Sequence, residues 1–304
     1  MNSTNCSQVI NCSCELANEP KTITLYLSDR EVAGSVLFLA LFGFAGFAQN
    51  LVVILSTILT DGLLDIPTNI FVLSLAVSDF LVCAVSAPLL IYNYYRWIFT
   101  TFITVSKFTV VATTGSIFLM TVNRFVSIVR PLRYPKIMTY KRSVTMTAGV
   151  WFVATLVPIL SIIGLNYDIQ SIVHITRYFL IFYITSSSAM YLYMYTLARK
   201  HRGQVAKLKH AVTGQMKTSS EEFKALCSLG LVAGSFAVCW LPMTIGFFFT
   251  NRNTDPNKFY RTFTFTAPLA VINAAIDPAI YYYRSKGFRF SLKTLSRRFQ
   301  NVGF

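Results

Sequence analysis

Seven long apolar stretches follow one another along the chain, separated by short polar segments. They lie near residues 32–57, 68–93, 101–129, 143–165, 173–197, 225–250 and 262–283. Each is long enough for a transmembrane helix, which needs about 20 consecutive, mostly apolar residues to cross the hydrocarbon core. The pattern predicts an all-α membrane protein, a seven-transmembrane helix bundle formed by residues 32–283 as one domain.

Composition supports the membrane assignment. Of the 304 residues, 54% are hydrophobic and 13% are charged, whereas a soluble domain carries about 25% charged residues. After the last span, residues 284–304 place Phe288, Leu292, Leu295 and Phe299 near helical spacing with basic residues between them. This is typical of a short amphipathic C-terminal helix lying on an anionic membrane surface. A disordered basic tail is the alternative.

The net charge of +15 is concentrated on one side of this topology. Most lysines and arginines fall in residues 130–142, 199–217 and 284–298. The positive-inside rule makes this side cytoplasmic and places the N-terminus outside. The first inner loop does not follow the trend, since it carries Asp61 and Asp65 and no base. This distribution indicates membrane orientation and no nucleic-acid partner.

The polar N-terminal tail, residues 1–31, supports the same orientation. It contains three glycosylation sequons within thirteen residues, which begin at Asn2, Asn5 and Asn11. We therefore expect a glycosylated extracellular tail and a multi-pass protein of the plasma membrane. Of the tail's three cysteines, Cys6, Cys12 and Cys14, at most one pair can form an internal bridge.

Five polar residues inside the predicted spans lie at mid-depth or in the half nearer the cytoplasm and form a candidate group: Asn50, Asp79, Thr113, Asn273 and Asp277. Polar residues in spans are expensive and mark function more often than structure. Two carboxyl groups at similar depth cannot both be ionised unless a cation compensates them; otherwise one is protonated. The group is suited to Na⁺, with amide and hydroxyl oxygens completing the site. A hydrogen-bonded core with a neutral Asp277 and no ion is the other interpretation.

Pro242 in span six and Pro278 in span seven are candidate kink sites. Pro242 and Pro278 each remove a backbone hydrogen bond and favour a kink. Trp240 precedes the first proline by two residues, and Tyr281 follows the second by three. An aromatic side chain beside a kink can couple a pivot of the helix to a pocket, although most membrane prolines only bend a helix.

Two opposite charges are predicted at the inner ends of spans three and six. Arg124 ends the apolar part of span three. Glu222 precedes Pro242 by 20 residues, about five and a half helical turns. A pair between Arg124 and Glu222 could hold the two spans together in one state and release them in another. Two unrelated charges that reach toward solvent are the alternative.

Six motifs appear in order on these spans: AQNLVV, LSLAVSD, NRF, Trp151 in span four, CWLP and DPAIY. Together they resemble the rhodopsin-like (class A) G-protein-coupled receptors over roughly residues 32–300. The resemblance implies that Asp79 and its partners form a sodium pocket and that Trp240 acts as a toggle. It also implies that Arg124 meets a heterotrimeric G protein and that Tyr281 swings inward on activation.

Within that family, the chain is most similar to the melanocortin receptors. The segments LRYPKIMTYKRS, MYLYMYTLARKH and DPAIYYYRS carry this likeness. It implies that Tyr191 meets Tyr281 in the active state, and it hints at cyclic AMP signalling. One departure concerns Asn123, which stands where the family usually has an acid. We therefore expect ligand-free activity, with Glu222 as the remaining latch. Asp277 also replaces a commoner Asn.

The ligand region departs from the melanocortin pattern. Those receptors use acids in the outer parts of spans two and three to bind a peptide arginine and calcium, but SAPLLIYNYY and TTFITVSKF contain none. Instead, Lys107, Arg177 and His174 lie near the outer ends of spans three and five, with Ser106 and Phe247 as further candidates. A desolvated cation attracts carboxylate or phosphate, which suggests an anionic or lipid-like ligand. A melanocortin-like peptide is the alternative, as is a Lys107 that only snorkels.

Other classes of function fit less well. A channel or transporter would use Asp79 and Asp277 as ion sites, but the sequence shows neither an inverted repeat nor a charged path. For an intramembrane enzyme, the sequence shows no zinc-binding helix motif, nucleophile elbow or phosphate loop. Its three histidines, His174, His201 and His210, are scattered along the chain. The sequence therefore predicts a receptor and not an enzyme. Its expected partners are an extracellular ligand, a G protein and the bilayer, with Na⁺ as the one candidate ion.

Overall fold

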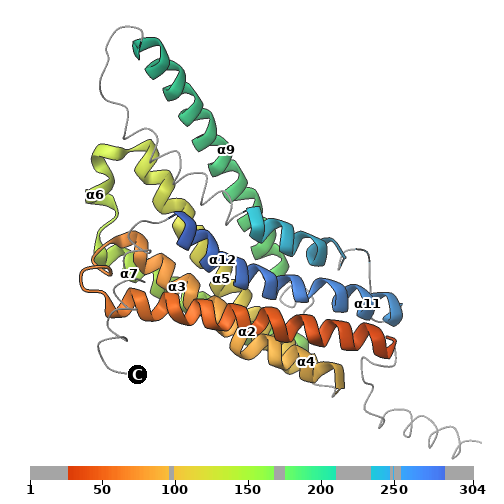
Figure 1. The fold of residues 1–304 in the computed structure, drawn as a ribbon. Helices are drawn as coiled ribbons and strands as arrows, with labels where there is room; N and C mark the ends of the chain where they lie inside the picture. Colours follow the sequence, from red (N-terminus) through yellow and green to blue (C-terminus); the bar gives the residue numbers. More distant parts are fainter. Residues whose placement is uncertain are drawn as a thin grey trace, which may run out of the picture.

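The secondary-structure elements of the described residues are all helices, joined by short turns. The computed structural model describes residues 27–95, 99–167, 175–209, 234–246, 249 and 255–284. Its elements are α2 (Asp29–Leu59), α3 (Pro67–Leu81), the π-helix η2 (Val82–Ser86), α4 (Ala87–Tyr95), α5 (Phe99–Val129), η3 (Pro131–Arg133), α6 (Tyr134–Ile137), α7 (Tyr140–Asn166), α9 (Ile175–Lys209), a helix over 234–246, α11 (Pro256–Thr266) and α12 (Pro268–Arg284) (Figure 1).

The helices agree with most of the predicted spans. Within the described ranges, four stretches are long and apolar enough to cross a membrane: Asp29–Leu59, Pro67–Tyr95, Thr101–Val129 and Tyr140–Gly164. The helix that contains the fifth predicted window, α9, continues well past that window to Lys209 and projects beyond the rest of the bundle (Figure 1). Of the sixth window, only 234–246 and residue 249 are described.

The seventh window is two helices where the sequence predicted one. Helix α11 ends at Thr266, Ala267 forms a turn, and α12 begins at Pro268. The cause is local, because Pro268 has no N–H to donate to the carbonyl of Thr264 in the preceding turn. Ala267 still donates to the Phe263 carbonyl at 2.9 Å, so α11 is complete up to the break.

Two further features follow from sequence signals at element boundaries. Ser28 and Glu31 form a capping box at the start of α2: the Glu31 N–H donates to Ser28 Oγ (3.4 Å), and the Ser28 N–H donates to Glu31 Oε2 (2.9 Å). In the second span, Pro88 follows the π-helix η2, where the Ala87 N–H reaches the carbonyl of Val82. The extra residue in this turn accommodates a proline that cannot donate.

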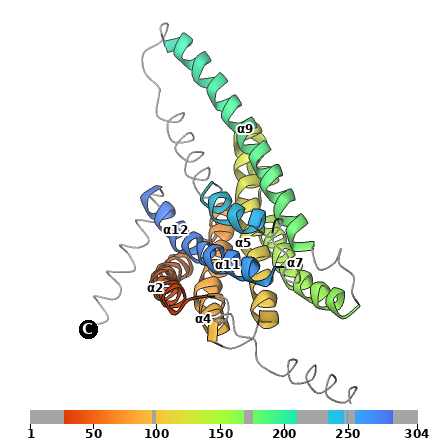
Figure 2. The same cartoon turned by 90° about the vertical axis from the view of Figure 1, so that its right-hand side faces the viewer.

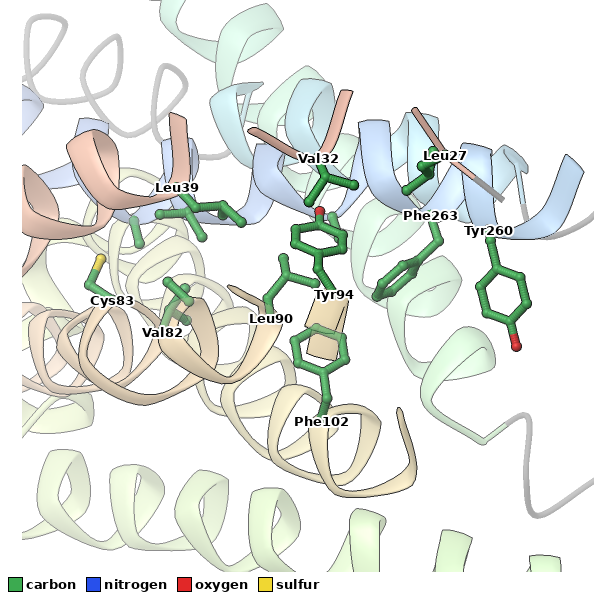
Figure 3. Close-up of a cluster of buried hydrophobic side chains, with 14 residues drawn as sticks. Leu27, Val32, Leu39, Val82, Cys83, Leu90, Tyr94, Phe102, Tyr260 and Phe263 are labelled. Carbon is green, nitrogen blue, oxygen red and sulfur yellow. The ribbon is translucent and has the colours of Figure 1, made fainter. Parts of the chain in front are cut away.

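The helices pack as a bundle in which α5 lies centrally, against α3, α7 and α9, while α2 packs against α3 and α12 (Figures 1 and 2). We call the end at which α2 begins the outer end and the end at which α2 finishes the inner end. At the outer end, α2, α4, α5 and α11 share an apolar cluster (Figure 3). Phe102 and Phe263 meet there edge to face, with ring centroids 5.5 Å apart.

Backbones approach closely at two glycines. A Cβ atom added to Gly46 of α2 would lie 2.6 Å from Cys83 Sγ and 3.3 Å from the Cα of Ala275 in α12. One added to Gly115 of α5 would lie 2.5 Å from Val150 Cγ1 in α7. Small residues allow membrane helices to pack at short range, where van der Waals contact drives association.

The outward surface of the bundle is apolar. On α7, Phe152 is 68% exposed, and Leu156, Ile159 and Ile163 are also exposed. Such a surface suits hydrocarbon, because lipid tails are as apolar as these side chains. The structure and the composition therefore agree on a membrane protein.

Candidate functional site

The five polar residues predicted inside the spans come together in the middle of the bundle. Asn50 of α2, Asp79 of α3, Thr113 of α5, and Asn273 and Asp277 of α12 are each at most 3% exposed. Thr113 Oγ1 donates to Asp79 Oδ1 at 3.4 Å, and Asn273 Nδ2 donates to Asp277 Oδ2 at 3.3 Å. The Asp79 and Asp277 carboxyl groups are close enough to interact electrostatically. We call these residues the polar core.

Asn50 completes the backbone of α12. Its Nδ2 donates to the carbonyl of Gly46 (2.9 Å) and to the carbonyl of Ala274 (2.8 Å). In a regular helix, the Ala274 carbonyl would accept from residue 278, but Pro278 has no N–H. The Asn50 amide therefore supplies the hydrogen bond that Pro278 removes. A side chain of one helix thereby compensates for the proline of another.

The polar core retains oxygen atoms without partners. Asp79 Oδ2, Asp277 Oδ1 and Asn273 Oδ1 are buried and accept no hydrogen bond in the described part of the chain. Unpaired buried acceptors are costly, so a proton, a water molecule or a cation would stabilise them. Carboxylate, amide and hydroxyl oxygens are ligands for hard cations, so these residues fit Na⁺. Among the described residues, no three or more His, Cys, Asp or Glu side chains gather as a metal-binding group.

At the inner end, Asn123 is fully buried and hydrogen-bonded on both sides. Its Nδ2 donates to Thr68 Oγ1 at 2.9 Å, and its Oδ1 accepts from the Tyr134 hydroxyl at 3.0 Å. Asn123 therefore connects α5 to the start of α3 and to α6. The sequence did not predict Thr68 or Tyr134 as partners of Asn123. The one signal it offered was the amide next to Arg124, since an amide can both donate and accept hydrogen bonds.

Arg124 lies on α5 beside Asn123 and is half-buried. Its Nε is buried and has no hydrogen-bond partner among the described residues, while Tyr134 and Tyr191 lie near its guanidinium group. The Asn123 side chain is engaged elsewhere and does not restrain it. Glu222, the predicted ionic partner, lies outside the described residues, so the latch stays a prediction.

Of the two tyrosines predicted to meet in the active state, the structure describes the side chain of Tyr191 and not that of Tyr281. The Tyr191 hydroxyl on α9 lies 3.4 Å from Thr121 Oγ1 of α5, near Arg124. Tyr281 belongs to α12, but its side chain lies outside the described residues. The pairing of Tyr191 with Tyr281 therefore stays a prediction.

Trp240 is buried in the centre of the bundle within an aromatic chain. It stacks on Phe236, with ring centroids 5.7 Å apart, and Phe236 meets Tyr183 edge to face at 5.2 Å. Tyr183 in turn meets Phe118 of α5 at 6.2 Å. Pro242 lies in the same helix, over 234–246. Ring contacts thus connect spans three, five and six through Phe118, Tyr183 and Phe236, and they end at Trp240, two residues before this proline.

A second hydrogen-bonded group connects three helices. Trp151 Nε1 of α7 donates to Ser74 Oγ of α3 at 3.0 Å, and Ser74 Oγ lies 2.7 Å from Ser116 Oγ of α5. Trp151 was identified from the sequence as a motif residue, but its serine partners were not. Single serines in apolar spans gave no signal that would have distinguished them.

The candidate ligand residues are only partly described. Ser106 and Lys107 lie in the outer half of α5. The Ser106 hydroxyl is buried and has no hydrogen-bond partner among the residues that the structure describes, and Lys107 is half-buried. Arg177 belongs to α9, but its side chain is outside the described residues, as are His174, Phe247 and the sequons at Asn2, Asn5 and Asn11. Neither residues 86–95 nor residues 100–108 contain an acid.

Comparison with known proteins identifies a family. Residues 49–281 match the 7 transmembrane receptor (rhodopsin family). The chain is 30% identical to melanocortin receptor 5 of Homo sapiens over 275 residues, which cover 85% of this chain and 82% of that receptor. It is 29% identical to melanocortin receptor 5 of Mus musculus over 97% of this chain and 95% of the receptor. Melanocortin receptor 3 of Homo sapiens is 26% identical over 85% of this chain and 84% of the receptor.

Proposed function

Because the chain belongs to the rhodopsin family of seven-transmembrane receptors, we propose that it transmits the binding of an extracellular ligand to a heterotrimeric G protein. The family is one of receptors and not of enzymes. The polar core is the observation that carries the proposal, since a static scaffold has no need of two buried carboxyl groups with unpaired oxygens. Such a group can exist in two protonation or ion-bound states, and a receptor needs two states.

The proposed mechanism is a two-state equilibrium. Ligand binding at the outer end favours a conformation in which the span that contains Pro242 moves outward at its inner end. This movement releases Glu222 from Arg124 and opens a cavity for the C-terminal helix of a G-protein α subunit. The ligand acts only through its different affinities for the two states. The basic residues of 130–142 support a cytoplasmic inner end and an extracellular N-terminus.

Sodium is proposed as a ligand of the inactive state. The Asp79 and Asp277 carboxylates, the Asn273 amide oxygen and the Thr113 hydroxyl would hold it. When bound, the ion would supply positive charge between two carboxylates that otherwise repel. The Thr113–Asp79 hydrogen bond then keeps α5 against α3, and Asn273 orients the Asp277 carboxyl group within α12.

Two ligand classes are proposed. An anionic or lipid-like ligand is favoured by the half-buried Lys107 and by the buried Ser106 hydroxyl beside it, which has no partner in the described part of the chain. The lack of acids in residues 86–95 and 100–108 favours the same class. A melanocortin-like peptide is favoured by the similarity to melanocortin receptors 5 and 3. Receptor-expressing cells exposed to melanocortin peptides, fatty acids and lysophospholipids distinguish these classes. An anionic agonist whose response disappears in Lys107→Ala at equal surface expression supports the first class.

G-protein coupling is tested by ligand-free activation. Cells that express wild type or Arg124→Ala at matched surface levels are measured with biosensors for each G-protein class. We expect basal activity in wild type, including a cyclic AMP response, and its loss in Arg124→Ala, because the variant lacks the cation offered to the α subunit. Equal signals from the two receptors would contradict coupling through Arg124.

Asn123→Asp tests the origin of that basal activity. The carboxylate cannot donate to Thr68 as Asn123 Nδ2 does, and it attracts the neighbouring Arg124 guanidinium. We expect lower basal signalling in this variant than in wild type. The control is Thr68→Ala, which removes the same hydrogen bond without adding a charge. Unchanged basal signalling in Asn123→Asp would refute the role assigned to Asn123.

A further inference from the structure

Four cations form an exposed patch at the inner end, where α5 passes through η3 and α6 into α7. They are Arg130, Arg133, Lys136 and Lys141, and we call them the inner basic patch. Residues 130–145 contain no acid, and none of the four forms an ion pair with a described residue. The patch therefore carries about four uncompensated charges at neutral pH.

The backbone beneath the patch is held in place. The Tyr134 hydroxyl donates to Asn123 of α5 at 3.0 Å, and Met138 is buried. From α7, Arg142 Nη1 donates to the carbonyls of Lys136 (3.0 Å) and Ile137 (3.1 Å). These contacts fix the short connection at both ends. The four cations are thus presented on an ordered frame, so a ligand would not have to order the loop.

The patch lies at the depth of the lipid headgroups. Lys141 and Ile159 of α7 are 18 residues apart, which is five helical turns, so they lie on one side of the helix. Ile159 is exposed on the apolar outward surface. The rise between them is about 27 Å, close to the thickness of the hydrocarbon core. Lys141 therefore lies where the outward side of α7 leaves the hydrocarbon.

Apolar groups accompany the cations. Tyr140 and Val144 of α7 are exposed beside Lys141, and Leu132 is 94% exposed between Arg130 and Arg133. The first turn of α7 contains Lys141 and Arg142 and no acid, so the partial positive charge of the helix N-terminus adds to the positive field. An anion with an attached apolar chain complements both properties.

We propose that the inner basic patch binds the headgroup of a polyphosphoinositide of the adjacent membrane leaflet. A headgroup with several phosphates matches four clustered cations better than one with a single negative charge, and its acyl chains would lie along α7. Clusters of four or more basic residues next to a transmembrane helix bind such lipids by charge attraction. The cytoplasmic location of the patch rests on the function proposed above.

The test measures binding of a fluorescent short-chain phosphatidylinositol bisphosphate to the full-length receptor in detergent, by anisotropy. Arg133→Gln/Lys141→Gln removes half of the patch charge. The matched control, Arg30→Gln/Lys258→Gln, removes two exposed cations of the outer end. We expect about 30-fold weaker binding for the patch variant, at about 1 kcal/mol for each basic residue near the anionic group, and unchanged binding for the control. Equal binding by the patch variant and wild type, or equal weakening in the control, overturns the proposal.

Two further arms identify the occupant. Soluble inositol trisphosphate should compete only weakly, because it lacks the acyl chains; full competition at equal concentration would mean a site for a soluble phosphate and overturn the lipid proposal. In nanodiscs of phosphatidylcholine alone, the patch variant should activate G protein as wild type does. Loss of activation there would assign the patch to the G protein. Lipid binding in detergent does not depend on coupling, so the two proposals can fail separately.

Discussion

At the scale of single residues, the polar core depends on side chains that replace missing backbone bonds. Pro278 cannot donate to the Ala274 carbonyl, and Asn50 does so from α2 at 2.8 Å. The α12 helix can therefore contain a proline next to the buried Asp277 without an orphaned carbonyl. The proline then leaves α12 dependent on α2 at this level, so a relative shift of the two helices must break a specific hydrogen bond.

Asn50→Ala should destabilise the receptor. The substitution leaves the Ala274 carbonyl buried without a partner, which costs about 1–3 kcal/mol, so the melting temperature of the purified receptor should fall. Ser56→Ala is the matched control: Ser56 is equally buried on α2, but its hydroxyl donates only to Val53 of the same helix, at 3.0 Å. Comparable melting temperatures for the two variants would show that the Asn50–Ala274 bond contributes nothing specific.

At the scale of elements, α2 determines how closely the seventh span can approach. Gly46 faces Cys83 and Ala275 at distances that leave no room for a methyl group, and Asn50 lies one turn further along α2. The α11–α12 pair is attached to α2 at two levels. Arg261 Nη2 of α11 lies 2.6 Å from Glu31 Oε1 at the outer end, and Ala274 of α12 is bound by Asn50. The break at Ala267 lies between these attachments.

Gly46→Ala should destabilise the packing of α2 against the second and seventh spans. Overpacking costs about 1–3 kcal/mol, which a lower melting temperature or reduced surface expression would reveal. Gly34→Ala on the same helix is the control, because nothing lies within 4 Å of its added Cβ; it should be neutral or stabilising, as alanine favours a helix. Adding Cys83→Ala to Gly46→Ala should restore part of the loss, and no recovery would argue against the Cys83 contact as its cause.

At the scale of the whole molecule, groups of side chains connect the helices at the outer end, in the middle and at the inner end of the bundle. The apolar cluster at the outer end joins α2, α4, α5 and α11. The polar core joins α2, α3, α5 and α12. At the inner end, Asn123 joins α3, α5 and α6. Only the middle one contains buried acids with unpaired oxygens. A change there alters contacts among four helices at once, which is the property that a two-state receptor requires.

Sodium should stabilise the whole receptor if the polar core binds it. At a free concentration ten times the dissociation constant, the free energy of unfolding should rise by about 1.4 kcal/mol. The melting temperature is measured in NaCl and in choline chloride at equal ionic strength. Asp79→Asn should remove the difference, because it replaces one carboxylate ligand with a neutral amide. No difference between the two salts in wild type would exclude a sodium site of this affinity.

The sequence by itself determined the helical membrane architecture, the basic character of residues 130–142 at the inner end and the polar positions within the spans. These are properties of local composition, because about 20 apolar residues cross a bilayer whatever their partners. The tertiary structure decided which side chains meet. Asn50 pairs with a carbonyl 224 residues away, and Asn123 with a threonine 55 residues away and a tyrosine 11 away. Such pairs depend on the rotation and depth at which each helix packs, and these are set by close contacts such as those at Gly46 and Gly115.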